Sequence, residues 1–283
     1  MCGWRLAALT LAIVLLAAGK TEAGPDGGRE LRFVRDGQEV ARLDLAALRS
    51  AGGVETVSVE DPYYETRKRF RAIPLEKVLR AGFGKPVREL RGTELLFRAK
   101  DGYVKPAAVE TIEEGAGYLA FADADHVRGE DPGWQPIDRR QVDPGPFYVV
   151  WTGEGRNDTH RYPWPYQLAV IEAVSFTERY PHTVPEGLAE KDPAWRGYEI
   201  FRRECFSCHA MNGEGGRVGP ELNVPRSIVE YRPIGQLKEF IRDPRSFRHT
   251  TMPAHRHLSG EDLDALIAYF DAMKTRKHDP EAE

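Results

Sequence analysis

The sequence has 283 residues, of which 41% are hydrophobic and 30% are charged, and its formal net charge is −4. This length and apolar content suffice for one large or two ordinary globular domains. The acidic balance argues against nucleic acid as a partner, because nucleic-acid-binding domains carry clustered positive charge.

The first 23 residues have the layout of a secretory signal peptide. Arg5 precedes an apolar run from Leu6 to Ala18, and small residues follow up to Ala23. The run is shorter than the ~20 apolar residues that a membrane-spanning helix needs. We therefore expect export to the periplasm with cleavage near Ala23, and an uncleaved anchor that keeps the protein membrane-associated is the alternative.

Residues 24–178 are expected to form a strand-rich α+β domain. Short β-type runs dominate, and the run 31–45 alternates apolar and polar residues around Asp36 and Gly37, which is typical of a hairpin. Two short helices are expected at 45–51 and 74–82, the second with Pro74 in its first turn.

Residues 179–193 contain three prolines among charged residues and are expected to be a linker. Helical periodicity then predicts an all-α domain over residues 194–283, with helices near 193–205, 234–244 and 259–277. Ser259 is the expected N-cap of the last helix, with Asp262 three residues later.

The stretch "CFSCH", Cys205 to His209, carries the main chemical signal. Cys-x-x-Cys-His in an exported protein is the attachment motif of a c-type haem. Two thiols three residues apart can each join one vinyl group of the porphyrin, and His209 then supplies the proximal iron ligand. A disulfide between Cys205 and Cys208, a thioredoxin-like redox pair and a zinc site are the competing interpretations.

The flanking sequence, from about residue 191 to 277, resembles the class I cytochrome c family. Its first helix carries Gly197 and Phe201 ahead of the motif, "GRVGPELN" resembles the family's Gly-Pro loop, and a Met-Pro pair precedes the final helix. The resemblance implies that the carbonyl of Pro220 accepts a hydrogen bond from His209, which would fix the imidazole tautomer.

Met252 is the expected second axial ligand of the iron, partly by elimination. Met211 lies too close to His209 in sequence to reach the other side of the ring, and Met273 sits late in a packed helix. Pro253 stiffens the loop that carries Met252. Three histidines also compete for the iron, although a solvated loop is their simpler interpretation: His249, His255 and His257.

An iron with both axial positions filled passes single electrons and has no open site for oxygen or peroxide. Basic residues exceed acidic ones between Arg226 and His257, around the methionine loop. We therefore expect a redox protein as partner, such as a membrane respiratory complex or a periplasmic dehydrogenase.

Residues 30–177 resemble the molybdopterin-binding domain of the sulfite-oxidase-like superfamily, through stretches that include "LLFRAKDGYV" and "GPFYVVWTG". That family holds molybdenum through a cysteine, and no cysteine lies between Lys20 and Glu204. We therefore do not expect molybdopterin, and we interpret this domain as a non-catalytic docking scaffold.

Together, these features predict an exported electron carrier with one covalent haem c rather than a stand-alone enzyme. Two alternatives stay open. One is a haem-linked oxidoreductase whose N-terminal domain binds a cofactor or substrate, and the other is a haem-based sensor from which Met252 is displaced.

Overall fold

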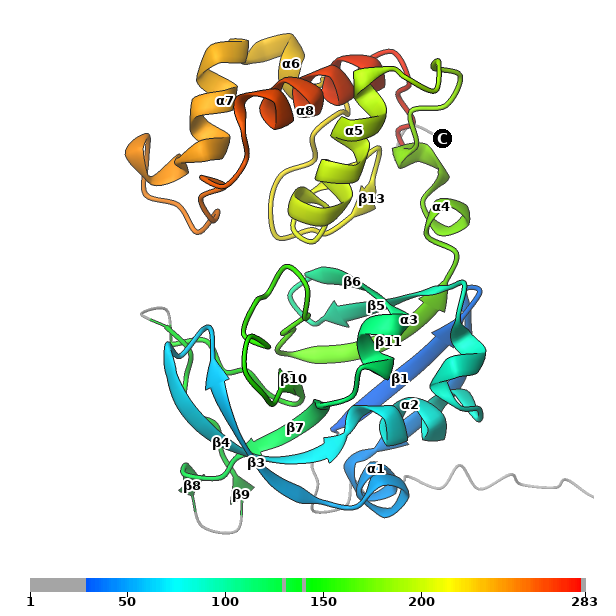
Figure 1. Ribbon diagram of the computed structural model, residues 1–283, viewed down its shortest axis with the longest axis vertical. Helices are drawn as coiled ribbons and strands as arrows, with labels where there is room; N and C mark the ends of the chain where they lie inside the picture. The colour runs from blue at the N-terminus through cyan, green and yellow to red at the C-terminus, as the bar shows by residue number, and fades with distance from the viewer. Residues whose placement is uncertain (1–28, 129–130, 139–140, 281–283) are drawn as a thin grey trace, which may run out of the picture.

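The computed structural model describes residues 29–128, 131–138 and 141–280, and the expected signal peptide lies outside these ranges. Figure 1 shows a strand-rich N-terminal region below a helical C-terminal region, joined on one side by the segment that contains α4 (Phe176–Arg179). Within the described ranges, no helix has the length and apolar character that crossing a membrane requires.

Two sheets build the N-terminal region. The first has five strands in the order β2-β1-β11-β5-β6: β1 (Glu30–Arg35), β2 (Gln38–Asp44), β5 (Glu94–Ala99), β6 (Val104–Ala108) and β11 (Leu168–Val174). The second has the order β10-β7-β4-β3: β3 (Glu55–Asp61), β4 (Thr66–Pro74), β7 (Gly117–Asp123) and β10 (Tyr148–Trp151). A small pair joins β8 (Val127–Arg128) to β9 (Asp131–Pro132). Strands β1 and β11 are parallel, and the other pairs are antiparallel.

Short helices cover the sheets: α1 (Leu45–Gly52), α2 (Leu75–Phe83), α3 (Val109–Glu113) and the 3-10 turn η1 (Val87–Leu90). The predicted hairpin is confirmed, because Asp36 and Gly37 connect β1 to β2 with φ angles of 49° and 75°. The two predicted helices are confirmed as well. The prediction that Pro74 lies in the first turn of the second helix is wrong by one position. Pro74 pairs with Tyr118 at the end of β4 and is the N-cap of α2, which begins at Leu75.

The C-terminal region is helical, apart from a small pair of β12 (Ala210–Met211) and β13 (Glu214–Gly215). Its other elements are η2 (Pro181–Thr183), α5 (Pro193–Ile200), the π-helical turn η3 (Phe201–Cys205), α6 (Ile228–Tyr231), α7 (Ile234–Arg242), η4 (Pro244–Ser246) and α8 (Gly260–Met273). The observed fold classes are thus α+β followed by a mainly α-helical region.

Helices α5 and α8 cross at close range and form the centre of the helical region. A Cβ added at Gly197 would lie 2.0 Å from the carbonyl oxygen of Ala265, so only glycine permits this approach. The rings of Phe201 and Tyr269 pack with centroids 5.3 Å apart. The predicted cap of α8 is confirmed, because Ser259 and Asp262 form a reciprocal capping box.

The two regions share apolar packing. Leu96, Val104 and Phe176 belong to the same buried cluster as the core of α5 and α8. The segment 179–193, expected to be a linker, is packed at its start, since Thr183 is fully buried and its carbonyl accepts a hydrogen bond from the Tyr269 hydroxyl at 2.7 Å. The helical region is therefore held against the sheet.

Backbone hydrogen bonds join the β5–β6 turn to the cysteine motif. The amide of Val104 donates to the carbonyl of Ser207 at 3.0 Å, and the amide of Arg217 donates to the carbonyl of Gly102 at 3.0 Å. Gly102 has a φ angle of 92°, which a side chain would strain. Asp101 and Gly102 thus form the turn between β5 and β6, and this part of the chain is hydrogen-bonded to the C-terminal region.

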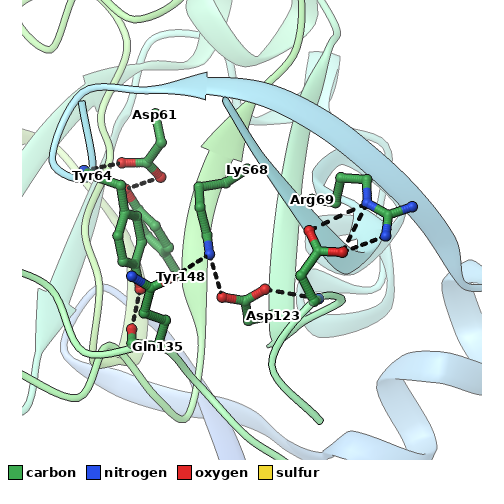
Figure 2. A network of polar contacts seen from close by, with 8 residues as sticks. Asp61, Tyr64, Lys68, Arg69, Asp123, Gln135 and Tyr148 are labelled. Carbon is green, nitrogen blue, oxygen red and sulfur yellow. Dashed lines mark hydrogen bonds and ion pairs between the residues drawn. The ribbon is translucent and has the colours of Figure 1, made fainter. Parts of the chain in front are cut away.

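A buried polar network ties the second sheet together (Figure 2). Lys68, on β4, pairs with Asp123 at 2.6 Å and donates to the side chain of Gln135 at 2.9 Å. Asp61 accepts a hydrogen bond from the Tyr148 hydroxyl at 2.9 Å, and burial raises the pKa of its carboxyl. Each of these buried polar groups has a hydrogen-bond or ion-pair partner in the protein, so we interpret the network as a stabilising part of the fold.

We predict that Lys68→Met destabilises the N-terminal region strongly. The substitution leaves the carboxylate of Asp123, which is 0% exposed, without its cation, and breaking a buried pair costs about 3–5 kcal/mol. Arg69 lies next to Lys68 on β4 and forms an exposed ion pair with Asp125. Arg69→Met, which breaks that pair, is the matched control and should change stability little. Urea unfolding followed by tryptophan fluorescence measures both, and equal losses in the two variants would contradict the prediction.

Candidate functional site: a haem-type cavity

One cavity of about 450 Å³ opens between the cysteine motif, α7 and the segment that carries Met252. Apolar side chains form most of its wall, among them Leu222, Leu237, Ile241 and Phe270. The structure brings all five residues predicted for the site to this cavity: Cys205, Cys208, His209, Pro220 and Met252. Apolar walls with a few convergent polar groups are typical of a cofactor site.

The cysteine motif forms a tight turn at the end of η3. The amides of Cys208 and His209 both donate to the carbonyl of Cys205, at 3.1 and 2.9 Å. The main chain thus folds back at once after the helix, and both sulfur-bearing residues and the imidazole reach the same cavity. This local fold follows from the spacing of the motif.

A hydrogen bond fixes the orientation of His209. Its Nδ1 lies 2.7 Å from the carbonyl oxygen of Pro220. Because a carbonyl only accepts, Nδ1 carries the proton and Nε2 keeps its lone pair. Burial lowers the pKa of His209, which favours the neutral imidazole that binds a metal. The residue therefore has the protonation and tautomer of a metal ligand.

Gly219 allows this hydrogen bond to form. A Cβ at this position would lie 2.5 Å from Cε1 and 2.7 Å from Nδ1 of His209. Such contacts are shorter than van der Waals distance, so any side chain would displace the imidazole or the loop. The Gly-Pro pair thus supplies both the space and the acceptor for His209.

The loop between the motif and Pro220 is closed by Glu221, a residue that the sequence analysis did not identify. Its carboxylate accepts hydrogen bonds from the amides of Asn212, Gly213 and Asn223 at 2.8–3.0 Å. The side chain of Asn223 then bridges to Asn212 and to the carbonyl of Met273. A sequence signal existed in the "GPELN" stretch, but its partners become visible only in the fold.

The two cysteines do not have the environment of a redox-active pair. Burial raises the pKa of Cys205 to about 12 and that of Cys208 to about 11. Reactive Cys-x-x-Cys pairs instead have thiol pKa values lowered by nearby positive charge or a helix N-terminus. The environment suits sulfurs placed against an apolar cofactor better than thiolates poised for exchange.

Met252 reaches the cavity from the segment between η4 and α8. It is partly buried, and its amide is near the Thr250 hydroxyl, at 3.2 Å. Met211 and Met273 are 0% and 1% exposed and contribute nothing to the cavity wall. Among the methionines of the described ranges, Met252 is thus the one that faces the cavity, and its thioether is a known axial donor to haem iron.

The three competing histidines have different positions. His249 is exposed and lies outside the cavity wall, and His257 is half-exposed. The interpretation of all three as a solvated loop is wrong for His255, which is 6% exposed and lines the cavity. Its amide donates to the carbonyl of Ile241, which holds this part of the loop against α7.

The donor set therefore fits a c-type haem: two sulfurs, a neutral imidazole and a thioether around an apolar cavity. Residues 192–270 match the family described as cytochrome c oxidase, cbb3-type, subunit III. Cytochrome c oxidase subunit 2 of Alkalihalophilus pseudofirmus is 36% identical over 87 residues, which cover 28% of this chain and 25% of that protein. The chain thus spans about a quarter of that relative. These matches support a cytochrome c domain at the C-terminus, and they imply haem c and electron transfer.

We predict that Gly219→Ala lowers the yield of haem-loaded protein several-fold, because the added Cβ collides with the ring of His209. Gly235→Ala in α7 is the matched control, since a Cβ there meets nothing within 4 Å. Haem content per chain, measured by pyridine haemochrome absorbance after expression with a cytochrome c maturation system, compares the two. Equal haem content in both variants would show that the contact has no role.

Proposed function

We propose that this protein is an exported mono-haem c-type cytochrome that passes single electrons between redox partners. In this proposal the haem is attached through Cys205 and Cys208, and His209 and Met252 are its axial ligands. The observation that carries the proposal is the hydrogen bond between Nδ1 of His209 and the carbonyl of Pro220, which orients the imidazole in a cavity that Met252 also lines.

The residues of the site suit outer-sphere electron transfer. A bound haem c supplies an iron that cycles between two oxidation states, and filling both axial positions leaves no coordination site for a substrate. Pro220 keeps the proton of His209 on Nδ1 in both states. The apolar wall, which includes Leu222, Leu237 and Phe270, excludes water and disfavours the more highly charged oxidised state.

We predict that Met252→Ala removes the weak methionine–iron charge-transfer band at the red end of the oxidised absorption spectrum. The reduced variant should also bind carbon monoxide at neutral pH, whereas the reduced wild type should not. Met211→Ala is the control for general loosening of the core, because Met211 is buried away from the cavity. Retention of the band in Met252→Ala would assign the axial position to another residue, such as His255, which also lines the cavity.

The rim of the cavity has the composition of a docking surface. Val218, Tyr231 and Phe247 are 43–48% exposed although they line the cavity. The exposed Arg232 and Arg248 also line it, and neither makes an ion pair within the part of the chain that the structure describes. An apolar centre with a basic rim favours a partner whose docking patch is acidic.

We predict that Arg248→Glu slows oxidation of the reduced protein by the anionic reagent hexacyanoferrate at low ionic strength by several-fold. The same substitution should accelerate the reaction with a cationic ruthenium hexaammine. Both effects should fade near 1 M salt, where the Debye length is about 3 Å. Arg88→Glu, on η1 in the N-terminal region, is the control of equal charge change. If the stopped-flow rates changed equally in Arg248→Glu and Arg88→Glu, the rim would not be the docking surface.

The N-terminal region acts in this proposal as a scaffold that fixes the cytochrome domain within a larger respiratory assembly. The shared apolar cluster and the hydrogen bonds of Val104 and Gly102 to the motif region support a rigid rather than a flexible attachment. A respiratory redox partner agrees with the oxidase subunits that the C-terminal region resembles. The sulfite-oxidase-like ancestry of residues 30–177 stays a prediction.

A further inference from the structure

A second cluster of metal-binding side chains lies where the two regions meet, outside the proposed haem ligands. Glu204, the residue before Cys205, has a side chain that is 2% exposed. Its Oε1 accepts a hydrogen bond from Arg203 at 2.7 Å, whereas its Oε2 is buried without any hydrogen-bond partner. An unpartnered buried carboxylate oxygen is costly and needs an explanation.

Imidazole nitrogens from both regions surround this oxygen. Nδ1 of His160, from the loop between β10 and β11, and Nε2 of His257, from the methionine segment, each lie 3.3 Å from Oε2 of Glu204. Nδ1 of the buried His255 lies 3.5 Å from the same atom. The three ligand atoms of His160, Glu204 and His257 all lie within 4.8 Å of one another.

The spacing matches a shared metal better than hydrogen bonds. Charge-assisted hydrogen bonds between nitrogen and a carboxylate are about 2.7–2.9 Å long. Ligand atoms of a tetrahedral zinc ion, bound at about 2.0–2.1 Å, are instead about 3.3–3.4 Å apart. The 3.3 Å distances from Glu204 to His160 and His257 therefore have the length of tetrahedron edges.

We propose that His160, Glu204 and His257 form a zinc site that clamps the N-terminal loop to the cytochrome domain. Two imidazoles and one carboxylate are a common zinc ligand set, with a water molecule in the fourth position. His160 and His257 are 51% and 46% exposed, so they can rotate to complete the geometry, and solvent zinc can reach them. Oε2 of Glu204 gains the partner it lacks.

The electrostatic state of the cluster suits a cation. Burial raises the pKa of Glu204, but the neighbouring side chains of His255 and Arg203 hold it well below its usual range. The carboxylate is therefore ionised and ready to bind a metal.

The test uses tag-free, haem-loaded protein stripped with a chelator and titrated with zinc chloride by isothermal titration calorimetry at pH 7.5. We expect one zinc ion per chain, and a loss of affinity of at least tenfold in His160→Ala and in Glu204→Gln. His249→Ala removes an exposed histidine of the same segment outside the cluster and should bind zinc like the wild type. Because His160 lies on an exposed loop, its variant stays informative even if Glu204→Gln folds poorly.

Hydrogen exchange distinguishes a clamp from surface binding. Zinc should slow exchange in residues 156–162 and 253–258 of the wild type and leave both segments unchanged in His160→Ala. The proposal would be overturned if the wild-type protein bound no zinc with a dissociation constant below about 100 μM. A His160→Ala variant that binds zinc as tightly as the wild type would overturn it as well. Neither result depends on the identity of the haem ligands.

Discussion

The hydrogen bond from Nδ1 of His209 to the carbonyl of Pro220 fixes the orientation of the imidazole on which the proposed haem site depends. It requires Gly219 beside the ring, because any Cβ there would collide with the imidazole. It also requires a loop of fixed length, which Glu221 closes by accepting three backbone amides. One polar contact thus sets the orientation of the His209 imidazole, which is the iron ligand in the proposed function.

Contacts between the N-terminal and C-terminal regions hold the cavity in a defined position relative to the sheets. The amide of Val104, at the start of β6, donates a hydrogen bond to Ser207 in the cysteine motif, and Leu96 and Val104 pack into the helical core. A freely tethered cytochrome would instead move relative to its neighbour, and its docking orientation would vary. In the proposed function, the rim around Arg232 and Arg248 is the surface that we expect a partner to meet. The proposed zinc clamp at Glu204 would strengthen the same arrangement.

The sequence predicted those features that depend on residues close together in the chain. The spacing of Cys205, Cys208 and His209 identified a segment that lines the cavity, and periodicity placed α5, α7 and α8 close to their observed bounds. Contacts between segments that are distant in the chain could not be predicted from the sequence. His160 and Glu204 are 44 positions apart, and each alone is an ordinary surface residue type. The burial of His255 likewise depends on packing against α7, which a local pattern of charged and polar residues does not encode.

The central claim is that a tetrapyrrole is bonded covalently to this chain through the two thiols of the motif. Mass spectrometry of the purified protein, made in a host with a cytochrome c maturation system, tests it most directly. We expect one added haem mass that survives denaturation, maps to the peptide containing Cys205 and Cys208, and disappears in the double serine variant. A denatured chain of unmodified mass, with haem absent or released by acid, would contradict the account.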